Sequence, residues 1–217
     1  MPVVSTQVGD QIEPACGSCR RDTYKFDFAR SYGLYSDVLR HLILRVKFRH
    51  HERLGYALGA LLTGLWPWAL EVTDGRAPVL VPVPLHSSRR RERGFNQAEL
   101  MARGCQRALA RLKKKPPPVE GGWIERVQPT RPQSGLDPRA RRENVRGVFA
   151  VSRKARPSGV SVVLVDDVMT TGATLSACAR ELKRAGAVRV IALTAARATP
   201  LFPDVRAEAV DAMPPEP

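Results

Sequence analysis

Two adjacent carboxylates followed by a run of hydroxyl side chains are the residues best suited to chemistry in this 217-residue chain. Asp166 and Asp167 directly follow the apolar residues 162–165, and a short stretch with three threonines and a glycine comes next. Neighbouring carboxylates suit a pair of vicinal hydroxyl groups, whereas hydroxyl and backbone N–H donors in front of a helix suit a phosphate. The pattern therefore predicts a sugar-phosphate site. Its phosphate-binding part comprises Thr170, Thr171, Gly172, Ala173 and Thr174.

The segments around this string predict a parallel α/β sheet that positions it. Residues 160–165 are apolar apart from Ser161, as in a strand buried on both faces. Apolar residues at helical spacing follow up to Gly186, which stands where a C-terminal cap belongs, and 188–196 form another apolar run. Strand, helix and strand at this spacing make a βαβ unit with parallel strands. The acid pair then lies at the carboxyl edge of the sheet, where open parallel sheets bind ligands.

Further elements are expected upstream of the acid pair. The first 33 residues are polar and read as irregular. Apolar periodicity predicts helices, one of which is stopped by Pro67 and another of which is capped by Asn96 with Glu99 in a capping box. The expected helices cover residues 34–48, 54–65 and 94–112, and the expected strands cover 79–81 and 148–151, with a further strand that begins at 123–124.

The composition indicates a globular protein with a strongly basic surface. Apolar residues make up 43% of the chain, and 35 basic residues against 21 acidic ones give a net charge of +14. Such a charge predicts an anionic partner: nucleic acid, an acidic membrane surface or a polyphosphate metabolite. No apolar run is long enough to span a bilayer, no signal peptide is evident, and four cysteines make no disulfide framework. We expect a cytoplasmic protein without a membrane span.

Three separated stretches, which together lie within about residues 26–197, carry a resemblance to a known family. Residues 162–174 are similar to the thirteen-residue phosphoribosyl-pyrophosphate (PRPP) motif of type I phosphoribosyltransferases. Residues 81–85 with the arginines at 89–91 and the string 93–100 form the second stretch, and residues 133–149 form the third. In this order they resemble the ComF/GntX family of competence-related, phosphoribosyltransferase-like proteins.

The resemblance implies a fold and a division of the chain. The expected fold is α/β, a type I phosphoribosyltransferase-like parallel sheet flanked by helices, with a small hood region and an irregular N-terminal segment that contains cysteines. The phosphoribosyltransferase-like domain is expected over residues 34–199. Residues 1–33 are expected to precede it as the irregular segment, and residues 200–217 to follow it as a Pro-rich flexible tail.

The resemblance also implies roles for the residues of the string. Asp166 and Asp167 would be the catalytic carboxylates and hold the ribose 2′ and 3′ hydroxyls, directly or through a magnesium shell, while residues 170–174 bind the 5′-phosphate. Mg²⁺ is the cofactor expected with PRPP. In such enzymes pyrophosphate is displaced at ribose C1 through an oxocarbenium-like state, with cations carrying the charge of the leaving group.

Basic residues elsewhere are expected to meet the pyrophosphate and to cover the site. Pro84, Arg89, Arg90 and Arg93 follow strand 79–81, and arginines make paired, charge-assisted hydrogen bonds with phosphates. A solvated basic face is the alternative interpretation of this run. Arg141 and Asn144 are expected to belong to the hood, or else to begin a short helix.

Two functions from different classes fit these features. The first is a PRPP- and Mg²⁺-binding protein, and whether it transfers the phosphoribosyl group to an acceptor, which no residue identifies, stays open. The second is a non-catalytic competence, DNA-uptake or DNA-processing factor that binds single-stranded DNA or the uptake machinery, with the PRPP site regulatory. Three lysines at 113–115 motivate the second function, and so do the rings of Phe95 and Trp123, which could stack on bases or equally well belong to the core.

The cysteines do not indicate a metal site. Cys16 and Cys19 form a single Cys-x-x-Cys pair, whereas members of the family often carry two such pairs and structural zinc normally takes four ligands. Cys105 and Cys178 lie at apolar helix positions and are expected in the core. We therefore expect no zinc, and a remnant zinc ribbon at Cys16 and Cys19 is the alternative interpretation of this pair.

Overall fold

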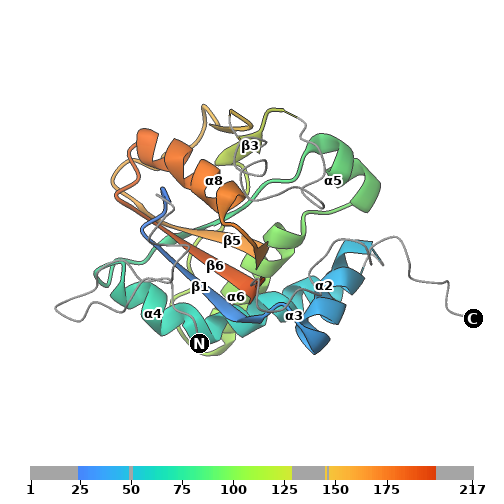
Figure 1. The fold of residues 1–217 in the computed structure, drawn as a ribbon. Helices are drawn as coiled ribbons and strands as arrows, with labels where there is room; N and C mark the ends of the chain where they lie inside the picture. Colours follow the sequence, from blue (N-terminus) through green and yellow to red (C-terminus); the bar gives the residue numbers. More distant parts are fainter. Residues whose placement is uncertain (1–23, 49–50, 129–144, 146, 199–217) are drawn as a thin grey trace, which may run out of the picture.

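The computed structural model describes residues 24–48, 51–128, 145 and 147–198, and a four-stranded parallel sheet lies at its centre (Figure 1). The strands lie in the order β1-β6-β5-β2. Strands β5 and β6 follow each other in the sequence, whereas the neighbouring pairs β1–β6 and β5–β2 bring together strands from distant parts of the chain. Their bounds are β1 Phe28–Leu34, β2 Val79–Pro82, β5 Ser161–Met169 and β6 Arg189–Arg197. The α/β class and the parallel arrangement expected from the sequence are confirmed.

Helices cover both faces of this sheet. Helix α8 and the antiparallel strand pair β3–β4 lie on one face, and α3, α4 and α6 lie on the other (Figure 1). The bounds are α2 Asp37–Phe48, α3 Glu52–Leu61, the 3₁₀ helix η1 Leu62–Leu65, α4 Trp66–Glu71, α5 Ser87–Arg93, α6 Gln97–Arg111, β3 Ile124–Arg126, β4 Phe149–Val151 and α8 Ala173–Arg184. No helix of the described residues is long and apolar enough to cross a membrane.

Two apolar cores result, because successive side chains of a strand point to opposite faces. Val162 and Leu164 of β5 join the core under α8 and the β3–β4 pair. Val163 and Val165 join the core under α2, α3 and α6. All four residues are fully buried, so β5 lies between the two cores.

The prediction that residues 1–33 are irregular is wrong for Phe28–Gly33, which belong to β1. The polar side chains of this strand interrupt the apolar pattern from which a buried strand is predicted, but residues of other elements contact them. The guanidinium of Arg30 lies 4.6 Å from the ring centre of Trp68, and the Ser31 hydroxyl is hydrogen-bonded to Thr194 at 2.6 Å. The domain therefore begins upstream of residue 34.

Two further predictions need correction between β1 and α6. The helix expected over 54–65 ends as an α-helix at Leu61 and continues as η1 to Leu65, so Pro67 does not stop it; Pro67 instead lies in the first turn of α4, where its missing N–H costs no hydrogen bond. The segment after β2, where no helix is expected before residue 94, is helical from Ser87 to Arg93. This short helix α5 ends at Gly94, whose φ of 79° gives the left-handed turn that leads into α6.

Asn96 caps α6 as predicted and ties this helix to the sheet. Its Oδ1 accepts the N–H of Ala98 at 3.1 Å, and its Nδ2 donates to the carbonyl of Val83 at 3.0 Å, directly after β2. The expected capping box is replaced by ion pairs of Glu99, whose carboxylate accepts from Arg103 at 2.8 Å. The start of α6 is thus held at the carboxyl edge of the sheet.

Candidate ligand-binding site

The carboxyl end of β5 leads into a tight turn before α8. Thr170 and Thr171 are half-buried there, and Gly172 adopts a φ of 74° as the first residue before the helix. A Cβ at Gly172 would lie 3.0 Å from side-chain atoms of Met169 and Tyr24, so glycine suits both the conformation and the space. Gly172 offers no side chain to cap α8, and the positive end of the helix faces the turn.

The two carboxylates lie on opposite faces of β5. Asp166 is on the face toward α8 and β3, where it interacts electrostatically with Arg126 and Cys178. Asp167 is on the face toward α2 and is 5% exposed. Strand alternation, which is strict at this position, therefore separates the surroundings of the two acids although they are neighbours in the sequence.

Asp166 is a carboxyl group with a strongly raised pKa. Burial is the main cause, the charge of Asp167 adds to it, and together they raise the pKa of Asp166 to about 7. The N–H of Asp167 donates to Asp166 Oδ1 at 2.9 Å and favours the charged form, as do Lys47 and Arg126. A carboxyl group poised near neutrality at a sheet edge is typical of functional sites.

Asp167 forms an ion pair with a lysine of α2, the helix on the face of the sheet that Asp167 points toward. Lys47 Nζ lies 3.0 Å from Asp167 Oδ2, with 23% of the lysine side chain and 8% of the aspartate side chain exposed. Burial by itself would lower the pKa of Lys47, but the negative charge of Asp167 beside it raises the pKa above its ordinary value. Tyr35 lies within electrostatic reach of both groups, and its pKa is raised because burial outweighs the effect of Lys47.

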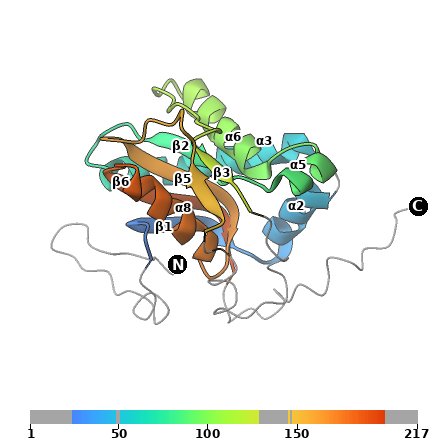
Figure 2. The ribbon, with the colours of Figure 1, turned by 90° about the horizontal axis from the view of Figure 1, so that it is seen from above.

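Of the predicted pyrophosphate residues, Arg93 is the one that the fold brings to the acid pair. Its guanidinium donates to Gln97 Oε1 at 2.7 Å and lies 5.8 Å from the ring centre of Phe48 at the end of α2. Burial lowers the pKa of Arg93, and Asp167 partly offsets this. Figure 2 shows α2 and α5 side by side at this end of the molecule.

The other residues of that group are farther out. Arg89 pairs with Glu92 at 3.7 Å, and Arg90 with Glu99 at 3.8 Å; their side chains are 47% and 63% exposed. Pro84 is half-buried in the segment between β2 and α5. The predicted hood residues Arg141 and Asn144, like Cys16 and Cys19, lie outside the described residues.

Several predictions outside the site can also be compared with the structure. Cys105 and Cys178 are buried in the two cores, as expected, and burial raises the pKa of the Cys105 thiol to about 12. Phe95 is buried as well, so the idea that it stacks on bases is wrong. Trp123 is half-buried against the core under α8.

Two basic residues of the site were not predicted, although the sequence holds a signal for each. Lys47 follows Ile43 by four positions, which places a charged residue beside the buried face of the expected helix. Arg126 follows Ile124 by two positions and so shares its inward face in β3. A charged residue on a face that is otherwise apolar is the observation that could have found both.

Comparisons with known proteins agree with this arrangement. The family model of the phosphoribosyl transferase domain matches residues 74–211. Competence protein F of Haemophilus influenzae is 33% identical over 84% of this chain and 78% of its own length. The DNA utilization protein YhgH of Salmonella typhimurium is 31% identical over 81% and 74%, and competence protein ComFC of Bacillus subtilis is 27% identical over 81% and 68%.

Proposed function

Because the chain belongs to the ComF family of proteins with a phosphoribosyl transferase domain, we propose that it binds PRPP with Mg²⁺ as the donor in phosphoribosyl transfer. The observation that carries this proposal is the continuous edge formed by Asp166, the turn at 170–172 and the start of α8, with Lys47 and Arg126 on its two sides. Along this edge lie carboxylates that suit ribose hydroxyls, hydroxyl groups that suit a 5-phosphate, and cations that suit a second, anionic substituent of the ribose.

Each part of this edge has a role in the proposal. The hydroxyl groups and the positive helix end take the 5′-phosphate, and the two carboxylates accept the ribose 2′ and 3′ hydroxyls. Arg93, with Arg89 and Arg90 farther out, faces the pyrophosphate. When the bond between ribose C1 and the pyrophosphate oxygen breaks and C1 bonds to the acceptor, these cations stabilise the charge that develops on the leaving group.

The residues present suit a magnesium ion that arrives with the substrate. Mg²⁺ is usually held by one or two carboxylates together with substrate phosphates, and Asp166 is a partly exposed oxygen donor at the edge. Asp167 is already paired with Lys47, so Asp166 is the residue that we expect to hold the ion. When bound, the ion supplies positive charge against the pyrophosphate oxygens.

Isothermal titration of PRPP into the protein with Mg²⁺ tests this proposal. We expect binding by the native chain and its loss when Asp166 and Asp167 are both replaced by asparagine. Asp74→Asn serves as the matched control, because Asp74 is an exposed acid that pairs with Arg189 at the amino edge of the sheet, away from the acid pair. Native protein that does not bind PRPP, or a double variant that binds it as tightly as the control, contradicts the proposal.

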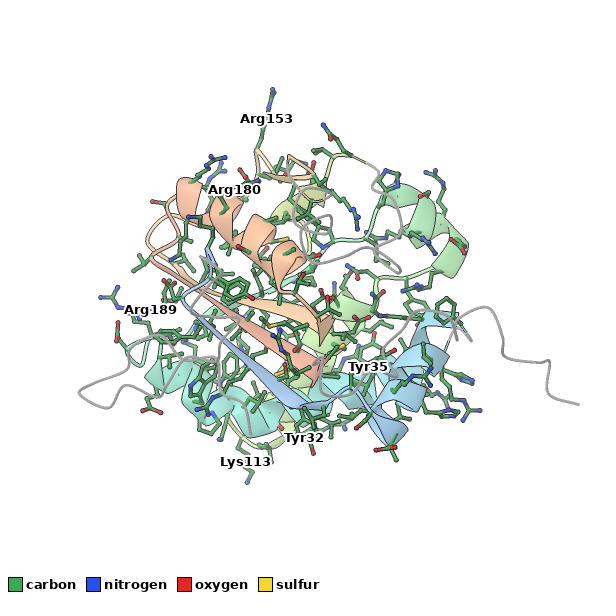
Figure 3. The ribbon with its side chains drawn as sticks, viewed as in Figure 1. Tyr32, Tyr35, Lys113, Arg153, Arg180 and Arg189 are labelled. Atoms are coloured by element: carbon green, nitrogen blue, oxygen red, sulfur yellow. The ribbon has the colours of Figure 1, made fainter. Side chains whose placement is uncertain are left out.

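A second candidate function is the binding of single-stranded DNA. Relatives named for DNA utilization and competence favour it, and so does an exposed run of cations in which Arg103, Arg107 and Arg111 lead along α6 to the lysines at 113–115. Figure 3 shows Lys113, Arg153 and Arg189 projecting outward on different sides of the molecule. Lys113 belongs to the run along α6, which is the kind of basic stripe that binds a nucleic-acid backbone, whereas Arg153 and Arg189 do not belong to it.

Fluorescence anisotropy with a labelled oligonucleotide at several salt concentrations tests the second function. Each phosphate that the protein neutralises releases counterions, so affinity should fall steeply with salt. Replacing the lysines at 113–115 with glutamine should make the slope shallower. Affinity that is absent at about 50 mM salt, or a slope that the substitutions leave unchanged, argues against this function.

A further inference from the structure

The ion pair between Lys47 and Asp167 joins the ligand-binding edge to an element outside the region that the family model matches. Lys47 lies in the last turn of α2, whereas the matched region begins at residue 74. Its ammonium group reaches Asp167 Oδ2 at 3.0 Å, across the interface between α2 and the sheet. One of the two carboxylates of the string therefore has its partner on a distant part of the chain.

A second contact holds the same end of α2 at the site. The Phe48 ring, which is 46% exposed, lies 5.8 Å from the guanidinium carbon of Arg93, and Arg93 is within electrostatic reach of Asp167. The end of α2 thus contacts both the strand that carries the acids and the helix α5 that carries the arginines. Lys47 and Phe48 are placed where the position of α2 affects the geometry of the site.

Stability alone is a poor reason for this ion pair. Taking two charges out of water costs about as much as their attraction returns, and apolar residues of similar size often stabilise a fold better. Among the other ion pairs of the described residues, that of Arg189 with Asp74 has one well-exposed member, at 72%, whereas the side chains of Arg180 and Glu181 are 28% and 17% exposed. The Lys47–Asp167 pair is the more buried kind, and it lies at the edge where the ligand is expected.

The pair also solves a local electrostatic problem. Asp166 and Asp167 are neighbours whose like charges repel each other, and strand alternation turns Asp167 away from the turn at 170–172. A cation on that side attracts Asp167 and fixes one of its oxygens. The pair engages Oδ2, which leaves Oδ1 as the oxygen that a ligand hydroxyl would contact.

We propose that Lys47 is a positioning residue of the site, which holds the Asp167 carboxylate in the orientation that accepts a ribose hydroxyl. This inference rests on the proposed function and adds to it a residue from outside the phosphoribosyl transferase region. Lys47 acts through Asp167. It does not touch the pyrophosphate, which Arg93 and the other arginines of α5 face.

The test compares three ligands that separate the ribose from the pyrophosphate. PRPP with Mg²⁺, ribose 5-phosphate, and pyrophosphate with Mg²⁺ are titrated into the native chain, Lys47→Met, Lys47→Arg, Asp167→Asn and the Lys47→Met/Asp167→Asn double variant. Lys183→Met is the matched control, because Lys183 pairs with Asp27 at the end of α8 that lies away from the turn. Circular dichroism and thermal melting of each variant accompany the titrations.

We expect Lys47→Met to weaken PRPP and ribose 5-phosphate on the order of tenfold to 100-fold, the range for a lost hydrogen bond to a charged group. Pyrophosphate should bind within about twofold of native affinity, and Lys47→Arg should restore most of the loss. The double variant should bind no more weakly than Asp167→Asn, because Lys47 has no effect without its partner. If Lys47→Met does not fold, Lys47→Gln takes its place in the same comparison.

Three results would overturn the role of Lys47 while leaving the proposed function intact. They are native PRPP affinity in Lys47→Met, an equal loss for pyrophosphate, and losses that add in the double variant. A native chain that binds neither PRPP nor ribose 5-phosphate would overturn the proposed function, and the role of Lys47 with it. A Lys183→Met variant that loses affinity as Lys47→Met does would show that the effect is not specific to the site.

Discussion

At the scale of residues, the acid pair consists of two carboxylates with different surroundings. Asp166 lies toward α8 and the β3–β4 pair, shares its surroundings with Arg126, and has a pKa raised to about 7. Asp167 lies toward α2 and is paired with Lys47. Two residues that are identical in the sequence therefore differ in the fold: Asp166 has a pKa of about 7, and Asp167 is a carboxylate paired with a cation.

The raised pKa of Asp166 leads to a prediction about stability and pH. Because its pKa in the folded chain, about 7, exceeds the ordinary value of 3.8, folding favours the protonated form. The stability that this group contributes is fully present below about pH 4 and is lost as the pH rises to about 7. Asp166→Asn should therefore raise the free energy of unfolding at pH 8 by about 2–4 kcal/mol, and urea unfolding at pH 4 and pH 8 measures this.

The control for that prediction is an acid whose side chain is exposed to solvent. Glu125 is exposed on β3, and Glu125→Gln should change the free energy of unfolding little at either pH. A stabilisation by Asp166→Asn that is equally large at pH 4 would refute the explanation, because at that pH the folded protein carries an uncharged side chain at position 166 whether the residue is Asp or Asn.

At the scale of elements, the close approach of α3 and α6 supports the half of the core that carries α2. Glycines permit this approach: a Cβ at Gly104 would lie 2.2 Å from the carbonyl oxygen of Tyr56, and one at Gly59 would lie 2.0 Å from that of Met101. Each helix thus packs a glycine against the backbone of the other. The start of α6 is in turn fixed to the end of β2 through Asn96.

We expect Gly104→Ala to destabilise the protein by about 3 kcal/mol, because a backbone carbonyl cannot move aside as a flexible side chain can. Denaturant unfolding followed by circular dichroism measures the loss. Gly64→Ala is the matched control, since a Cβ there would meet no atom within 4 Å. Equal stability of the two variants would show that α3 and α6 can separate at little cost.

At the scale of the whole molecule, two clusters of positive charge in the described part of the chain bear on the two proposed functions. Arg93, Arg126 and Lys47 gather at the carboxyl edge of the sheet, around the acid pair. The lysines at 113–115 follow the far end of α6, and the chain then returns alongside the start of β2, where Pro118 accepts the N–H of Leu80. The two proposed functions therefore use opposite ends of the sheet.

This separation predicts that the two binding activities can be removed independently. Replacing the lysines at 113–115 with glutamine should leave the PRPP affinity within about twofold of the native value, because charges beyond the Debye length of about 10 Å are screened. Arg93→Gln should weaken PRPP binding and leave the salt dependence of DNA binding nearly unchanged. Titrations of both ligands with both variants test this, and a parallel loss of both activities in either variant would contradict it.

The sequence by itself determined the βαβ unit, the acid pair with its Thr-Gly turn, and the caps at Asn96 and Gly186, because such signals lie within a few neighbouring residues. Only the tertiary structure decided that 28–34 form a strand, since the partners that Arg30 and Ser31 contact, Trp68 and Thr194, come from distant segments. It alone also showed which cations meet the acids. The contacts of Lys47 and Arg126 depend on how α2 and β3 pack against opposite faces of β5, and no local pattern encodes a distance between segments so far apart in the chain.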